Sequence, residues 1–273
     1  MRPPKWSWSL LYPQYWLLWV LLAFFYLCAH LPLMIQYALG RGIGQLLYLF
    51  GSARRKVAEI NIQLCFPELN KRQQCLLVHK NMLSTGIGFM EQNMAWFMPR
   101  KKMQSLIQVE GLQHLQSLQG QGAIVVMRHT TTISLGVVAV TLFHAATGMY
   151  RRHKNPVIEY VQRRGRERMR ADTVAFERKE IRAMLKFLRQ GAMVIYSPDQ
   201  DYGIKQGLWA KYFGIEAATV AATPRFAQMT KAKVIIMDFV RLCDNQGDKQ
   251  GRKQGYKLSF SAPLDDFPSG NEL

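Results

Sequence analysis

The sequence predicts a layered α/β domain that is preceded by helices and by an N-terminal membrane anchor helix. Three observations predict this architecture. The first 40 residues contain a long apolar segment, the next part of the chain keeps a helical period, and from about residue 107 short apolar runs alternate with helical patterns. We therefore expect an anchor at 1–40, a helical segment packing on the core at 41–106, and an α/β core at 107–273.

The proposed anchor lies in a stretch, residues 6–40, that contains no Lys, Arg, Asp or Glu. Its centre, Tyr15–Ile35, has about the 20 apolar residues that a helix needs to cross a bilayer. A cleaved signal peptide is the alternative, although no small-residue cleavage site is evident. His30 and Pro32 leave open a helix that enters the bilayer without spanning it. More Lys and Arg follow the segment than precede it, which favours a body that faces the cytoplasm.

The helical segment extends to about Pro99, with a break near Gly51. Its longest predicted helix is Asn70–Met98, which opens with Asn70 as a plausible N-cap. The four cysteines of the chain lie far apart and form no CxxC pair. We therefore expect reduced, structural thiols, and we predict neither a metal site nor a cofactor.

The α/β core is expected to alternate strands with helices. The predicted strands are Ala123–Met127, Met193–Tyr196, Val234–Val240 and Tyr256–Phe260. The predicted helices are Ser134–Ala145, Glu177–Arg189 and Ala217–Thr230. The polar, glycine-rich stretch from Cys243 to Gly255 predicts a mobile hairpin loop. The last residues match neither a helix nor a strand, so we expect a further C-terminal element beyond residue 273.

His129 follows the first strand of this core and precedes a helix. Open α/β sheets bind ligands at the carboxyl ends of their strands, so this position suits a general base that takes a proton from a hydroxyl. The alternative is a histidine that is hydrogen-bonded locally, and position alone does not decide between the two.

A cluster of basic residues follows between Met149 and Arg170, with seven arginines and one lysine against two glutamates. Arginine forks match phosphate groups, whereas lysine would serve solubility equally well. We therefore predict that Arg151, Arg164 and Arg166 contribute to a site for an anionic headgroup. A solvated charged helix is the alternative.

Two carboxylates, Asp199 and Asp201, stand on a turn after the predicted strand that ends at Tyr196. Such residues orient hydroxyls, bind metals or cap turns, and turn-capping is the commonest role. Because no histidine or third carboxylate adjoins them in the sequence, we predict a role in substrate binding rather than a metal site.

Lys and Arg number 36 against 18 Asp and Glu, a net charge of +18. This charge favours acidic partners: nucleic acid, anionic lipid or an acidic protein. No zinc-finger or helix-turn-helix signature accompanies it, and few aromatic residues interleave with the arginines, so a nucleic-acid partner is not predicted.

Several motifs in order resemble the late acyltransferases of lipid A biosynthesis, the bacterial lauroyl- and myristoyltransferases. The resemblance rests on "RRKVAEINIQLCFPEL", "YRRHKNP", "RGRERMRADTV" and "YSPDQDYG", and it covers nearly the whole chain. It implies a glycerol-3-phosphate acyltransferase-like fold and an enzyme on the cytoplasmic side of the bacterial inner membrane. It also implies transfer of a fatty acyl chain from acyl carrier protein to a hydroxyl of an anionic glycolipid, the lipid A precursor.

The resemblance assigns the catalytic motif to His129 followed, five positions on, by an acid. Ser134 stands where the family has Asp or Glu. A serine brings no negative charge to stabilise an imidazolium, so one hypothesis is an impaired acyltransferase and another is a non-catalytic lipid-binding relative. A third is that the fold brings Asp199 or Asp201 to His129 instead. The strand "KVIIMDFV" departs from the family at Ile236 or Met237, where a proline is usual.

Overall fold

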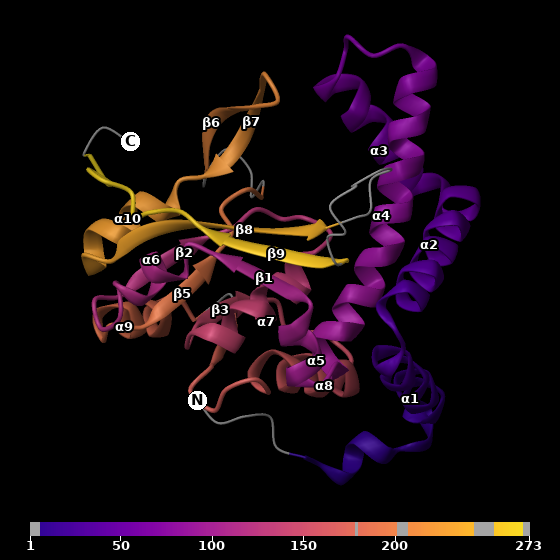
Figure 1. Cartoon of the computed structure of the whole chain (residues 1–273), viewed down its shortest axis with the longest axis horizontal. Coiled ribbons are helices and arrows are strands. Elements are labelled where there is room, and N and C mark those ends of the chain that lie inside the picture. The colour runs from indigo at the N-terminus through magenta and orange to yellow at the C-terminus, as the bar shows by residue number, and fades with distance from the viewer. Residues whose placement is uncertain (1–5, 178–179, 201–206, 243–253, 270–273) are drawn as a thin grey trace.

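The computed structural model describes residues 6–177, 180–200, 207–242 and 254–269. Helices come first and a mostly parallel sheet follows, which confirms the predicted α/β class (Figure 1). The N-terminal part contains η1 (Trp8–Leu11), η2 (Pro13–Tyr15), α1 (Trp16–His30), α2 (Leu33–Phe50), α3 (Ser52–Cys65), α4 (Lys71–Phe97) and α5 (Arg100–Ser105).

The apolar segment that we predicted as one anchor, Tyr15–Ile35, is divided between two helices. The first ends at His30, because Leu31 is extended ahead of Pro32, and Ile35 already belongs to α2. Lys102 caps the C-terminal end of α1 by donating hydrogen bonds of 2.8 Å to the carbonyl oxygens of His30 and Leu31. The described stretch Pro13–His30, of 18 residues, is long and apolar enough to cross a membrane, by length and composition.

Helix α4 begins and ends where the sequence provides caps. Asn70 accepts a hydrogen bond from the backbone of Gln73, and the Gln73 side chain accepts one from the backbone of Asn70, so the predicted N-cap is confirmed as a capping box. At the other end, Arg168 donates to the carbonyl oxygens of Met94, Ala95 and Met98.

The core contains β1 (Ile107–Glu110), α6 (Leu112–Gln116), β2 (Ala123–Val126), α7 (Ile133–Phe143), β3 (Thr147–Tyr150), α8 (Pro156–Glu167), β4 (Ala175–Glu177), α9 (Ile181–Arg189), β5 (Met193–Tyr196), β6 (Gly207–Tyr212), β7 (Ile215–Val220), α10 (Ala222–Thr230), β8 (Lys233–Leu242) and β9 (Gly255–Phe260). Seven strands form one sheet in the order β1-β9-β8-β2-β5-β3-β4, while β6 and β7 form a separate hairpin that stands at the top of Figure 1. Within the large sheet only the β8–β9 pair is antiparallel.

Both faces of the sheet are covered. Along β2, Ile124 packs with buried residues of α9 and α10, whereas Val125 packs with buried residues of α4, α5 and α7. This alternation is what a strand buried on two sides requires. It fixes β2 at the centre of the domain, with β5 and β8 as its neighbours.

The sequence-based prediction differs from the structure at one helix and at several strands, and a further part of it lies outside the described residues. Residues 217–220 were predicted as helix but belong to β7, because pairing with β6 overrides the helix preference of an alanine-rich run. The short strands β1, β3 and β4 were not predicted. Most of the predicted loop from Cys243 to Gly255 lies outside the described residues, as does Asp201.

Candidate active site

The candidate site is built where β2 and β5 end side by side. These strands are parallel, and Val126 lies opposite Tyr196. His129 and Asp199 each stand three residues beyond their member of that pair, so the two chains carry them to the same edge of the sheet. The contact between them follows from this common offset.

Asp199 holds His129 with both carboxylate oxygens. The backbone N–H of His129 donates to Oδ2 at 2.6 Å, and ring atom Nδ1 lies 2.6 Å from Oδ1. An ionised carboxylate only accepts hydrogen bonds, so Nδ1 carries the proton and the neutral ring presents its lone pair at Nε2. The Gln200 amide nitrogen lies 3.0 Å from Nε2 and donates to it. The His129 side chain remains 35% exposed, so Nε2 is accessible to a substrate that displaces Gln200.

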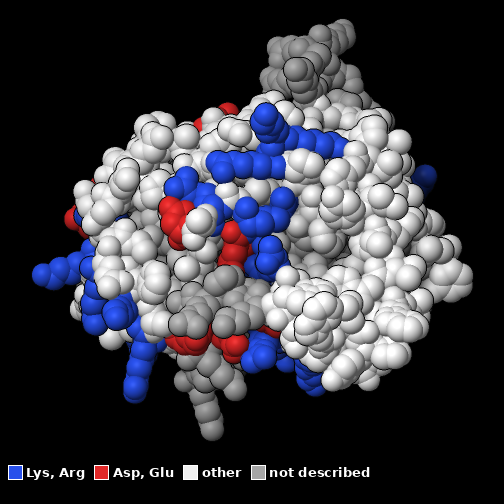
Figure 2. Space-filling view, turned by 90° about the horizontal axis from the view of Figure 1, so that it is seen from below, with Lys and Arg blue, Asp and Glu red and all other residues white. Residues whose placement is uncertain are grey.

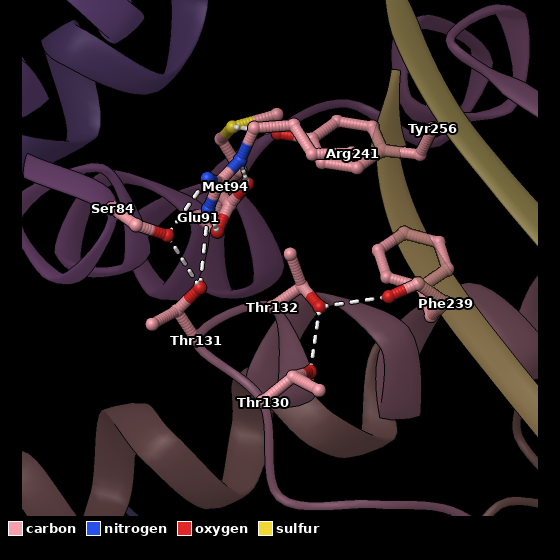
Figure 3. A network of polar contacts seen from close by, with 9 residues as sticks. All are labelled: Ser84, Glu91, Met94, Thr130, Thr131, Thr132, Phe239, Arg241 and Tyr256. Carbon is pink, nitrogen blue, oxygen red and sulfur yellow. Dashed lines mark hydrogen bonds and ion pairs between the residues drawn. The ribbon is translucent and has the colours of Figure 1, made fainter. Parts of the chain in front are cut away.

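The three threonines after His129 hold its loop in place (Figure 3). Thr132 donates to the carbonyl oxygen of Phe239 on β8 at 2.9 Å and shares a 2.8 Å hydrogen bond with Thr130. Thr131 shares a 3.1 Å hydrogen bond with Ser84 of α4. All three hydroxyls are therefore hydrogen-bonded within the protein.

Glu91 of α4 and Arg241 of β8 form a buried ion pair next to this loop (Figure 3). Arg241 also donates to Ser84 at 3.1 Å and to Thr131 at 3.4 Å. Burial raises the pKa of Glu91, and the hydrogen bonds from Arg241 oppose that shift. The pair was not predicted, although Glu91 is the one charged residue in "GFMEQNM" and therefore signals a charge on a largely buried helix.

Ser134 lies in a different environment from His129. It lines a cavity of about 60 Å³ between α4, α7 and α8, together with Arg166. Among the described residues its hydroxyl makes no hydrogen bond, while the carboxylate on His129 comes from Asp199. Of the alternatives that the sequence left open, the geometry agrees with the one in which Asp199 orients His129.

The arginine cluster divides into arginines used within the protein and arginines that remain exposed. Arg163 pairs with Glu167 at 3.2 Å, and Arg170 pairs with Asp172 at 2.8 Å. Arg151 and Arg164 are exposed. The underside of the molecule, which includes the end where α8 lies in Figure 1, carries more basic than acidic side chains (Figure 2).

No group of three or more His, Cys, Asp or Glu side chains within the described ranges is arranged to hold a metal ion. The structure brings His129 and Asp199 together as acid–base groups at this edge of the sheet. An oriented imidazole with an accessible Nε2 is suited to take a proton from a hydroxyl.

Comparison with known proteins decides the family. The family model described as bacterial lipid A biosynthesis acyltransferase matches residues 3–272. The chain belongs to this family. It is 35% identical over 271 residues to the lipid A biosynthesis lauroyltransferase of Escherichia coli K12, covering 96% of this chain and 85% of that one. It is 31% identical over 268 residues to the lipid A biosynthesis palmitoleoyltransferase of the same organism, covering 97% and 84%.

A lipid A biosynthesis acyltransferase of Haemophilus influenzae is 30% identical over 264 residues, covering 96% of this chain and 82% of its own length. Among solved structures, the 1-acyl-sn-glycerophosphate acyltransferase of Thermotoga maritima covers 87% of both chains at 14% identity, with a TM-score of 0.36. Membership of the lipid A acyltransferases supports acyl transfer in lipid A biosynthesis, a lipid substrate and a membrane context.

Proposed function

We propose that this acyltransferase moves a fatty acyl chain from the thioester of acyl carrier protein to a hydroxyl of an anionic lipid A precursor. The observation that carries the proposal is the contact between His129 and Asp199 at the ends of two paired strands. It supplies an imidazole in a fixed tautomer, with Nε2 accessible as the base.

In the proposed reaction one proton is transferred, and His129 carries it from the acceptor hydroxyl to the leaving thiolate. Nε2 takes the proton of the acceptor hydroxyl while its oxygen attacks the thioester carbonyl. The carbon–sulfur bond of the tetrahedral intermediate then breaks, and the imidazolium returns the proton to the leaving thiolate. The products are an ester and the free thiol of the carrier. The Asp199 carboxylate stabilises the imidazolium between the two steps.

Anionic groups of the substrate and carrier are proposed to bind the basic underside. Arg151 and Arg164 are exposed, and Arg152 and Lys154 line a cavity of about 240 Å³ together with Ser9 near the start of the N-terminal helices. This cavity joins basic side chains to the segment proposed as the anchor, which suits a lipid whose headgroup is charged. The net charge of +18 favours docking of an acidic carrier protein on the same side.

The N-terminal helices are proposed to hold the enzyme on the cytoplasmic face of the inner membrane, with residues 1–40 as the anchor. Large apolar side chains of α1 are exposed, among them Trp16, Leu17 and Phe24. A soluble surface seldom exposes such a continuous apolar group. The helical stretch Pro13–His30 is near the short end of the lengths that cross a bilayer.

The test is an acyl-transfer assay with detergent-solubilised protein, acyl carrier protein charged with fatty acid, and lipid A precursor. His129→Ala is expected to lower the turnover by about 10²–10⁴-fold, the usual contribution of a positioned base. His114→Ala is the matched control, because His114 lies on α6, which contacts β9, whereas the candidate site is built at the ends of β2 and β5. Equal loss in both variants, or no loss in His129→Ala, would exclude His129 as the base.

A second candidate, a non-catalytic lipid-binding relative, is favoured by one observation: Ser134 stands at the position of the motif acid. This candidate expects wild-type protein that binds the precursor but transfers no acyl chain from any of several donors. Ser134→Glu then separates the causes. Activity that appears in Ser134→Glu assigns the defect to position 134, whereas continued inactivity assigns it elsewhere.

A further inference from the structure

The cavity that contains Ser134 lies between α4, α7 and α8 and has polar groups on three sides. Gln92 of α4, Ser134 of α7, and Gln162 and Arg166 of α8 line it, and Trp96 forms an apolar wall. These groups are one cation, two amides and a hydroxyl. Its described lining includes no carboxylate.

Arg166 brings a buried donor without an acceptor to this cavity. Its Nε–H group is buried and donates to no acceptor among the described residues. Burial lowers the pKa of Arg166, which is the direction expected for a cation without a close counter-charge. Its neighbours Arg163, Arg168 and Arg170 all have acceptors within the protein. The guanidinium lies 5.7 Å from the centre of the Tyr150 ring.

The carboxylate of Glu159, also on α8, affects Arg166 electrostatically but is hydrogen-bonded elsewhere. Glu159 accepts a 2.6 Å hydrogen bond from the Tyr150 hydroxyl with one oxygen and a 2.8 Å hydrogen bond from the backbone of His153 with the other. Glu159 therefore acts on Arg166 through space, without a hydrogen bond. A buried guanidinium in this state is stabilised by an anion that enters from solvent.

We propose that this cavity binds a small monovalent anion, a short carboxylate or a halide, between Arg166 and Ser134. The volume of about 60 Å³ accommodates a few water-sized groups, so formate, acetate or chloride fits, whereas a sugar phosphate does not. The guanidinium supplies paired donors for a carboxylate, and the Ser134 hydroxyl and the two glutamine amides supply the remaining donors. The lining of this cavity shares no residue with the cavity of Arg152 and Lys154 that we assign to the substrate, and it contains the one arginine of the predicted set that is not exposed.

The experiment measures the melting temperature of the detergent-solubilised full chain at fixed ionic strength, with formate, acetate or chloride replacing gluconate. Gluconate is a carboxylate that is too large for the cavity. Saturation with the small anions is expected to raise the melting temperature by about 2–4 °C relative to gluconate, as for a ligand at several times its dissociation constant. Exposed Arg164 on the same helix provides the control, because Arg164→Gln should keep the full shift.

Two variants test the site from opposite directions. Arg166→Gln removes the cation and should abolish the anion-dependent shift. Ser134→Glu places a carboxylate of the protein in the cavity, and it should abolish the shift while melting higher than wild type in gluconate. Equal melting temperatures of the wild type in the small anions and in gluconate, or a full shift retained in Ser134→Glu, would overturn the proposal. If Arg166→Gln does not fold, the result with Ser134→Glu decides alone. None of these readouts depends on acyl transfer.

Discussion

Arg241 donates two hydrogen bonds to Glu91, at 2.6 and 2.7 Å, and thereby joins strand β8 to helix α4 inside the protein. The Glu91 side chain is fully buried and that of Arg241 is 10% exposed. The same guanidinium contacts Thr131, two residues after His129. The ion pair thus connects the long N-terminal helix to the loop that carries the proposed base.

Glu91→Gln is expected to destabilise the fold by about 3–5 kcal/mol, because it leaves the Arg241 guanidinium buried without a counter-charge. Chemical denaturation with urea measures the change. The control is Glu59→Gln, which breaks an exposed pair with Arg55 and should cost at most about 1 kcal/mol. A difference of less than 1 kcal/mol between the variants would mean that the buried pair adds little to stability.

Asp199→Asn is expected to lower acyl-transfer turnover by about 10²–10⁴-fold while the protein remains folded. The amide cannot stabilise an imidazolium, and it can donate to Nδ1 and so favour the wrong tautomer of His129. Turnover at saturating acyl donor is the measurement. Asp172→Asn is the matched control, because Asp172 pairs with Arg170 at the surface. Loss of turnover in the control alone would contradict the assignment.

Gly86→Ala is expected to destabilise the protein by about 1–3 kcal/mol or more through overpacking of α2 against α4. A methyl group at Gly86 would meet the backbone of Gly40 and Gly44, with the Gly44 Cα at 2.6 Å. The control is Gly42→Ala on the facing helix, α2, where a methyl group meets nothing within 4 Å. Helix propensity predicts that the control melts at the same or a higher temperature than wild type. Equal melting temperatures in both variants would show that the helices can separate without cost.

Replacement of Leu17, Val20 and Phe24 by serine should move the protein from the membrane fraction to the supernatant during carbonate extraction. These side chains are 82%, 66% and 54% exposed and share one face of the first helix. Ile181→Ser with Met229→Ser is the control, since both are exposed apolar residues outside the N-terminal helices. Retention of the triple variant in the membrane pellet would place the anchoring surface elsewhere.

The sequence predicted the central strands because β2, β5, β8 and β9 are apolar runs bounded by turn residues. It did not predict β3, whose residues Thr147–Tyr150 include a glycine and lack a run of β-branched residues. This strand exists because β4 and β5 flank it, and such pairing is not visible in local composition.

The site was predicted in part for the same reason. His129 could be selected because a strand precedes it and a helix follows it. Asp199 was selected for substrate binding, and its contact with His129 was only one of three hypotheses, because nothing in the sequence states that β2 and β5 are neighbours 70 residues apart. Gln200 stands in the same turn and was not selected. Its role depends on the direction of one side chain, which only the assembled site defines.

His129 and Asp199 each follow their paired strand residue, Val126 or Tyr196, by three positions. This equal spacing limits where residues can be inserted into the chain without separating the two side chains. A residue inserted into the β6–β7 hairpin would lengthen a separate element and leave the pair where it is. A single residue inserted after Val126 or after Tyr196 would shift one partner by about 3.3 Å along the strand direction, more than the 2.6 Å that now separates ring and carboxylate. Relatives that keep the chemistry should therefore vary in loop length across the chain but not in these two short connections.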